Sequence, residues 1–481
     1  DKHALHNQKP GRAFQNYDTS QQQQQEDPIF QPFRMHFDVS ELLAWKDTSP
    51  DNEARIDFLT SKVLPGMATI WSSALSVMPV QGPLKIDFQW CPFGHHNNQA
   101  FKEGIPQTDI VIFVTANSEV CERGPVLASA LACYWDQFER PIGGNIDFCL
   151  NTIETQNILP LTHTGEHGQT KSAAMETLQS NLLNNNSPTT QPKYDHMLRM
   201  AIGTAAHEFA HILGVTSADL LFFYDWETGK PRTPEPVQQL VHCVDGDYQT
   251  LWMPQETTLK QVKTDTDNYF LVTLPTVRQV VRNQFNCQSI EGGRLENQPT
   301  NGDCFGTHFD ERYFFTETMS PVSAGIPEIL SSLTLSLLHD SGWYMPNYAV
   351  AKVSPWGHAA GCSFLEEDCI QNEEVPDFGE GFFCNEPIDI SNGKIKKGSY
   401  GCDPTHTHIA MCDLVDYGYL QGIFQPPPEQ FQYFSENPVS ASIHCLYLFC
   451  LHLIMPIIEA GFVGGNSGLL SHIHSRIDLV P

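Results

Sequence analysis

The ten residues Ala205–Gly214, AAHEFAHILG, restrict what this chain can fold into more than any other stretch. Apolar residues surround the two histidines on nearly every side, which predicts a buried helix. His207 and His211 stand four positions apart and share one face of such a helix. Buried histidines need polar partners. The stretch therefore predicts a buried helix whose two imidazoles find a partner, and a metal ion would supply one.

Zinc chemistry gives each polar residue of this stretch a reason to be there. Two imidazoles at this spacing can reach one zinc ion at about 2.0–2.1 Å. Glu208 directly follows His207, so its carboxylate points around the helix toward a metal-activated water and can act as the general base. Two other interpretations stay open: a helix with solvent-facing histidines, and a site completed by a glutamate. Glu227 is the near candidate, but YDWETGKPRTP has the composition of a turn.

The third histidine ligand must lie well downstream of the helix. Gly214 ends the helix and lets the chain leave sharply, the metzincin arrangement, in which a third histidine follows. At the usual spacing the residue is Ser217, which cannot replace a histidine. His308 is the candidate, because it precedes the stretch ETMSP with Met319, which resembles the metzincin methionine turn.

This combination resembles the leishmanolysin family of metzincin zinc metalloproteases, which carries an insertion between the glycine and the third histidine. The insertion would run over residues 215–307 here, and the resemblance extends over about residues 37–434. Further stretches that resemble the family are TDIVIFVTA, GPVLASALAC, RPIGGNI, SPWGHAAGCSFLEEDC, FCNE and PPPEQFQYF. The resemblance implies an α+β fold: a metzincin-type catalytic domain with a twisted mixed sheet and an active-site helix, then a Cys-rich, disulfide-stapled C-terminal domain.

The resemblance also implies roles for individual residues. His207, His211 and His308 would bind one Zn2+ per chain, Glu208 would be the catalytic base, and Met319 would be the methionine of the turn. The implied function is a zinc-dependent endopeptidase that cleaves proteins or peptides with a metal-activated water. The alternative is a catalytically silent cell-surface adhesion or binding protein that keeps the fold. The implied disulfides are Cys91–Cys133 and Cys287–Cys362.

Secondary structure and domains follow from periodicity and composition. We expect helices over residues 52–80 (kinked at Pro65), 194–213, 277–285 and 327–342, and strands over 84–90, 108–116 and 143–153, the last preceded by a glycine turn. The expected division is a flexible polar arm (1–34), an N-terminal catalytic subdomain ending in the zinc helix (35–214), a central subdomain with the insertion, third histidine and methionine turn (215–350), a Cys-rich domain (351–434) and an unassigned tail (435–481).

Charge and cysteine usage indicate the compartment and the partners. The formal net charge is −29, which argues against nucleic-acid binding. The 14 cysteines form no CxxC pair, so disulfides in an oxidising compartment are expected, at the cell surface or outside the cell. A sequon at Asn185–Ser187 agrees with secretion.

The two ends of the chain and the remaining histidines carry weaker expectations. The chain starts at Asp1 without a signal peptide, so we expect a processed or partial chain. The apolar stretch Cys445–Ile458 is too short to span a membrane, and it is either buried or part of an anchoring signal. The other histidines that invite a metal role are His339, His358, His406 and His408; the last two are expected at the surface.

Overall fold

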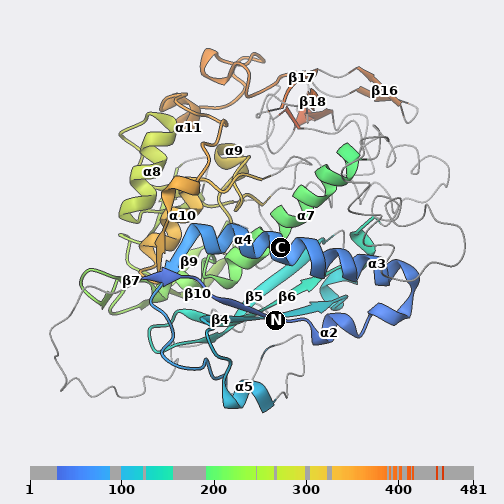
Figure 1. Ribbon diagram of the computed structural model, residues 1–481. Helices are drawn as coiled ribbons and strands as arrows, with labels where there is room; N and C mark the ends of the chain where they lie inside the picture. Colours follow the sequence, from blue (N-terminus) through green and yellow to red (C-terminus); the bar gives the residue numbers. More distant parts are fainter. Residues whose placement is uncertain are drawn as a thin grey trace, which may run out of the picture. The chain divides into compact units, whose positions relative to one another are not determined.

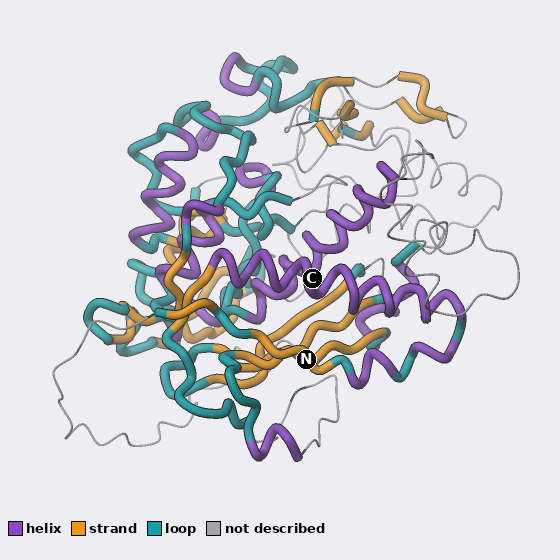
Figure 2. Tube along the Cα trace, viewed as in Figure 1, coloured by secondary structure: helices purple, strands orange, loops and turns teal. Residues whose placement is uncertain are grey.

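The computed structural model of the 481-residue chain describes residues 30–86, 91, 99–122, 126–154, 191–244, 246–264, 268–297, 304–321 and 328–386, and short segments between 389 and 448. The described chain forms two compact units, which divide between Leu213 and Gly214. Both units combine helices with strands (Figure 2). Disulfides link distant parts of the chain. The predicted α+β class is confirmed at this level, whereas the four-part domain division stays a prediction.

A four-stranded mixed sheet organises the first unit. Its order is β2-β4-β6-β5, with β2 (Met35–Asp38), β4 (Ile110–Ala116) and β6 (Pro141–Phe148) parallel and β5 (Ala128–Trp135) antiparallel to β6 (Figure 1). Every residue of β4 is buried, as its continuous apolar sequence predicts for a central strand. The predicted strand at 108–116 is therefore confirmed.

The helix that carries the HEFAH motif packs on this sheet. Helix α7 (Gln191–Ile212) contacts β5 and β6, and the helix expected over 194–213 is confirmed. Gly144 lies within β6, and a Cβ at this position would be 2.5 Å from Cγ2 of Ile212. A turn at Asp136–Glu139 does precede the strand, but the assignment of the glycines to it was wrong, because they lie inside β6 and Gly144 serves close packing of helix on sheet. The strand expected to reach residue 153 ends at Phe148.

The helix expected over residues 52–80 is shorter and is interrupted. Helix α3 (Pro50–Phe58) leads into the π-helical segment η2 (Leu59–Val63) and then into α4 (Leu64–Ala74), after which β3 (Leu75–Val77) begins. The irregularity lies just before Pro65, whose missing N–H cannot continue the normal ladder. Helix α4 and segment η2 both contact α7.

Near the start of the first unit, the structure contradicts two expectations, one for the polar arm and one for a strand. Strand β1 (Gln31–Pro32) pairs with β3, and the guanidinium of Arg34 donates to the Asp109 carboxylate at 2.7 Å, so residues 30–34 are folded. The rest of the predicted arm lies outside the described residues. A strand over 84–90 was wrong where it can be examined, since Leu84 forms only an isolated bridge with Ile105. The shorter elements of the unit are α2 (Ser40–Leu43), η1 (Lys46–Thr48), α5 (Gln99–Glu103), η3 (Glu119–Glu122) and η4 (Leu150–Thr152).

Residues 215–307, the predicted insertion, contain small antiparallel sheets and, among the residues described there, one amphipathic helix, all within the second unit. The sheets pair β7 (Tyr224–Asp225) with β8 (Lys230–Pro231), β9 (Val237–His242) with β10 (Tyr248–Met253), and β12 (Asn268–Val272) with both β11 (Leu259–Lys263) and β13 (Gly293–Arg294). Helix α8 (Pro275–Phe285) confirms the expectation for 277–285. Segment η7 (Asp219–Phe222) precedes these elements.

The remainder of the second unit is helical at first and then rich in short strands. Helix α9 (Glu311–Phe314) precedes α10 (Ser332–Asp340), which contacts α8 and β14 (Tyr344–Pro346). The helix expected over 327–342 is present only from Ser332 to Asp340, and the Ser331 side chain accepts from the amide of Leu333 at its start. Its expected first turn was wrong where it is described, because Ile329 and Ser331 form β-bridges; Pro327 lies outside the described residues. Later elements are η8 (Tyr348–Val350), α11 (Ser363–Glu366), η9 (Asp377–Gly379), β15 (Asp389–Ser391), β16 (Lys394–Lys397), β17 (Tyr400–Cys402), β18 (Ile409–Cys412), β19 (Val415–Asp416), β20 (Ser440–Ala441) and β21 (Tyr447–Leu448).

Disulfides connect distant parts of the chain. Both implied pairs are confirmed: Cys91–Cys133 in the first unit and Cys287–Cys362 in the second. Three more bonds are Cys121–Cys149, Cys243–Cys304 and Cys384–Cys412. Within the described residues, no helix has the length and apolar character needed to cross a membrane. The sequon at 185–187 and most of the stretch 445–458 lie outside them.

Candidate metal centre

Helix α7 presents two imidazoles from consecutive turns. The ring centroids of His207 and His211 are 4.9 Å apart, and the ring planes are inclined by 80°. His207 and Glu208 are buried, while His211 is partly exposed. The buried positions of Phe209, Ala210 and the neighbouring apolar residues agree with the expectation of a helix enclosed on most sides.

A tryptophan on a second helix fixes this part of α7. Trp71 on α4 is fully buried, and its indole Nε1 donates to the backbone carbonyl of Ala206 at 3.2 Å. The bond reaches the residue directly before His207. Aromatic packing between Trp71 and Phe209 adds to it, with ring centroids 6.1 Å apart. The backbone that carries the motif is therefore held by an indole as well as by the sheet.

His308 lies at a bend directly before the bridged residue Phe309, and its segment is held on both sides. On one side, the amide of Phe309 donates to the carbonyl of Met319 at 2.9 Å. On the other, the amide of Glu296 donates to the carbonyl of His308 at 3.1 Å, and that of Asp310 to Arg294 at 3.0 Å. His308 is 2% exposed, so its imidazole is withdrawn from bulk solvent.

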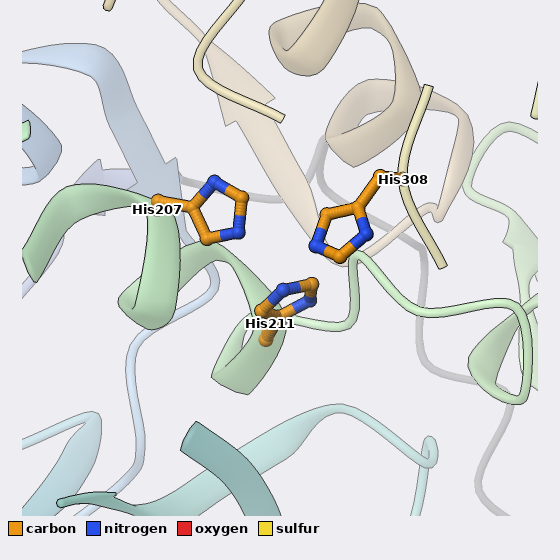
Figure 3. Close-up of side chains that lie close together, drawn as sticks. All are labelled: His207, His211 and His308. Carbon is orange, nitrogen blue, oxygen red and sulfur yellow. The ribbon is translucent and has the colours of Figure 1, made fainter. Parts of the chain in front are cut away.

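The structure brings together the three predicted ligand residues. One ligand nitrogen from each of His207, His211 and His308 lies within 4.8 Å of the other two. Figure 3 shows the three rings turned toward a common space, with His207 and His211 on one helix and His308 on another segment. Three neutral nitrogen donors suit a divalent metal ion of intermediate softness and leave a fourth coordination position open. This histidine group could hold a metal ion.

A carboxylate that was not expected from the sequence holds His308 in place. Oε1 of Glu296 lies 2.8 Å from Nδ1 of His308 and also accepts from the amides of Thr307 and His308, at 2.9 and 3.2 Å. With a proton on Nδ1, the Nε2 lone pair is left for a metal ion. Gly306 leaves the space for this carboxylate, since a Cβ there would be 1.8 Å from Cγ of Glu296.

The environment of Glu296 favours its ionised form. Burial by itself would raise the pKa of this carboxyl group. The adjacent imidazole of His308 and the two backbone amides lower the pKa by more than burial raises it, so it lies below its ordinary value. Glu296 lies twelve residues before His308, with no regular spacing to mark it. The antiparallel pairing of Leu295 with Phe309 sets these two residues side by side.

The segment around Met319, for which a methionine turn is predicted, is buried and hydrogen-bonded. Met319 is fully buried, and the amide of Ser320 donates to the carbonyl of Glu317 at 3.0 Å, which closes a tight turn. The buried Glu317 carboxylate accepts hydrogen bonds from the hydroxyls of Ser331 and Thr334. Burial raises the pKa of Glu317, although these bonds oppose the shift.

Other candidate ligands lie elsewhere. Glu227 is exposed in the turn between β7 and β8, as its sequence context predicts, and it is not part of the histidine group. Nδ1 of His339 lies 3.2 Å from the Tyr348 hydroxyl, and His358 is exposed. His406 and His408 lie outside the described residues.

The fold and the site define a candidate mononuclear metal centre built from histidines on a helix and on a distant segment. Comparison with known protein families identifies the family of this chain. The family model Leishmanolysin matches residues 48–171 and 239–455, which is more than half of the 481 residues, and the chain belongs to the leishmanolysin family. The residues between the two matched segments include His207, Glu208 and His211, so the motif and its geometry are evidence separate from this match.

Individual relatives agree with the family. A leishmanolysin-like peptidase of Caenorhabditis elegans is 28% identical over 336 residues, which cover 66% of this chain and 43% of the relative. A leishmanolysin-like peptidase of Drosophila melanogaster is 26% identical over 388 residues, 77% of this chain and 46% of the relative. A leishmanolysin homolog of Crithidia fasciculata is 24% identical over 402 residues, which cover 83% of this chain and 47% of the relative. The chain thus spans about half the length of the curated relatives it matches.

Proposed function

We propose that this chain is a zinc-dependent endopeptidase of the metzincin type, in which His207, His211 and His308 hold one zinc ion. The observation that carries the proposal is the histidine group, with one ligand nitrogen from each ring within 4.8 Å of the others and Glu208 directly after the first of them. A zinc ion held there would polarise the scissile carbonyl and make a water molecule a stronger nucleophile. Family membership supports the same reaction class.

Glu208 is the general base of this proposal. Successive helix residues are about 100° apart around the axis, so its carboxylate is turned away from the imidazole direction of His207. It is buried, at 8% exposure, beside the histidine pair. In the reaction it takes a proton from the attacking water and gives it to the leaving amine. Met319 is the methionine of the turn and acts through packing.

The proposed substrates are proteins or peptides, and the proposed location is the cell surface or the extracellular space. Five disulfide bonds within the described residues fit an oxidising compartment. A silent adhesion protein would have no chemical need for a carboxylate beside the histidine group, and the presence of Glu208 favours the enzyme.

The proposal is tested by measuring zinc content and peptide cleavage on the same samples of the parent chain, Glu208→Ala and His308→Ala. Glu208→Ala should keep its zinc and lose about 10²–10⁴-fold in turnover, the usual effect of losing a general base. His308→Ala should lose both zinc and activity. The exposed His358 gives the control His358→Ala, which should match the parent. Full activity in either site variant, or no zinc in the parent, would overturn the proposal.

A further inference from the structure

A cleft of about 730 Å³ lies within the insertion. Its lining comes from the β7–β8 hairpin, the turn before β11, and one face of α8. All of its lining residues fall between Asp225 and Glu291, so a single unit builds it. Clefts of roughly 300–1,000 Å³ are the usual size for small-ligand sites.

The charge of this cleft is opposite to that of the chain. Acidic residues outnumber Lys and Arg two to one overall, 56 against 27. In the lining, basic residues outnumber acidic ones, five to three: Lys230, Arg232, Lys260, Arg278 and Arg282 against Asp225, Glu256 and Glu291. A concentration of positive charge on an otherwise acidic protein attracts anions to this one place.

Part of this positive charge is not neutralised by the protein. Arg232 approaches Asp225 and Asp340, and Lys260 pairs with Glu291. In the region that the structure describes, the side chains of Lys230 and Arg278 make neither a salt bridge nor a hydrogen bond. These two cations are available to an external partner.

Helix α8 places two guanidinium groups one turn apart on the cleft wall. Arg278 and Arg282 are four residues apart, and both line the cleft. Like charges at this spacing destabilise a helix when nothing lies between them. Arg282 is anchored through Nε, which donates to the carbonyl of Ile290 at 2.9 Å. An anion bound between the two guanidinium groups would offset their repulsion and accept charge-assisted hydrogen bonds from both.

The rest of the lining indicates the chemistry of the ligand. Pro231 and Pro275 are the apolar members of the lining, and no aromatic ring is among them. The cleft therefore lacks a stacking surface for a nucleobase or an apolar pocket for a hydrophobic side chain. Hydroxyl groups complete it, from Thr228, Thr257, Thr258, Thr273 and Ser289. Those of Thr228, Thr273 and Ser289 already bond to other protein groups, which leaves Thr257 and Thr258 as hydroxyl donors for a ligand. Arginine forks with hydroxyl donors suit an oxyanion with several oxygens more than a lone carboxylate.

We infer that this cleft is a binding site for a phosphate or sulfate group carried on a polar ligand, with Arg278 and Lys230 as its principal cations. The inference does not depend on peptidase activity or on the metal. It assigns the insertion a recognition role separate from the histidine centre.

Calorimetric titration of the full chain with inorganic phosphate and with inorganic sulfate tests the inference, against chloride at equal ionic strength. We expect saturable binding of at least one oxyanion, weakened about 10-fold or more by Arg278→Gln, as befits the loss of charge-assisted hydrogen bonds. Lys230→Gln, an exposed position, should weaken it as well. The matched control is Lys352→Gln, which removes an exposed cation outside the cleft and should leave the affinity unchanged.

Two ester probes identify the source of the group. O-Phosphoserine binding more tightly than a sugar sulfate would indicate phosphate esters, and the reverse order would indicate sulfate esters. Absence of saturable oxyanion binding overturns the inference, as does equal affinity in the parent and in both cleft variants. Thermal unfolding of each variant checks that it is folded, and because Lys230 lies at the surface, a misfolded Arg278→Gln would still leave one informative variant.

Discussion

The carboxylate of Glu296 lies 2.8 Å from Nδ1 of His308, so the third imidazole of the candidate metal centre has a fixed orientation before any metal binds. In metal sites, such a carboxylate behind a histidine determines which ring nitrogen carries the proton and makes the other one a better ligand. Glu296 acts through His308 and is a positioning residue in the proposed site.

Substitution of Glu296 should weaken zinc binding without removing a ligand. We expect Glu296→Ala to lower zinc affinity by about 10–100-fold, the usual effect of losing such a partner. Glu296→Gln should lie closer to the parent, since the amide oxygen can still accept from Nδ1. Competition with a chromogenic chelator measures both. The control Glu53→Ala removes an exposed glutamate on α3. Parent-like zinc affinity in Glu296→Ala would show that the hydrogen bond has no role in metal binding.

Gly214 should resist substitution for two separable reasons. Its φ of +102° is unfavourable for other residues, and a Cβ there would be 2.7 Å from Cζ3 of Trp343. Gly381 has a φ of +80° with open space around it, so Gly381→Ala reports backbone strain alone. We expect Gly214→Ala to lose about 1–3 kcal/mol more stability than this control, as overpacking does. Equal losses in thermal or urea unfolding would assign the whole effect to the backbone.

The Cys287–Cys362 bond should be a major source of stability in the second unit. It joins residues 75 positions apart, from the end of α8 to the start of α11. Replacing both cysteines with alanine should cost about 2–5 kcal/mol. Cys402 is free and exposed, so Cys402→Ala is a matched control with little expected effect. Denaturant unfolding of the three proteins decides this, and a stable double variant would show that packing alone holds these segments.

Glu317 should make stability depend on pH in a defined direction. Its folded-state pKa is raised by burial, so the folded chain holds this proton more tightly than the unfolded chain does. The free energy of unfolding therefore falls as pH rises from about 4.3 toward the folded-state pKa, by at most about 1.4 kcal/mol for each pH increment of about 1. Glu317→Gln removes this dependence. The unfolding temperature of Glu317→Gln minus that of the parent should increase from pH 4 to pH 7. A difference that stays constant or decreases over this range contradicts the assignment.

Sequence patterns predicted the elements whose residues carry a single consistent signal. Strand β4 is apolar throughout and α7 is apolar on nearly every side of its motif, and both were predicted close to their observed bounds. The glycines Gly143 and Gly144 were misassigned to a turn, because a missing side chain suits a turn and a close packing contact equally well. The packing of Tyr134 against Gly143 and of Ile212 against Gly144 distinguishes the two.

The candidate site was predictable only where chemistry and spacing coincide. His207 and His211 are marked by their spacing, and His308 by the methionine turn that follows it. Glu296 has no such mark, because its contact with His308 depends on how two extended segments pair. The basic cleft has none either: its cations are spread over residues 230–282, and α8 together with the small sheets brings them to one wall.

The position of Glu296 has a consequence for how the insertion can vary in length. Its last part, from β13 to Thr307, supplies the strand partner of Phe309, the carboxylate behind His308 and the glycine that accommodates it. A deletion of even a few residues after Gly293 should therefore separate Glu296 from His308, and the imidazole proposed as the third ligand would lose the hydrogen bond that sets its orientation.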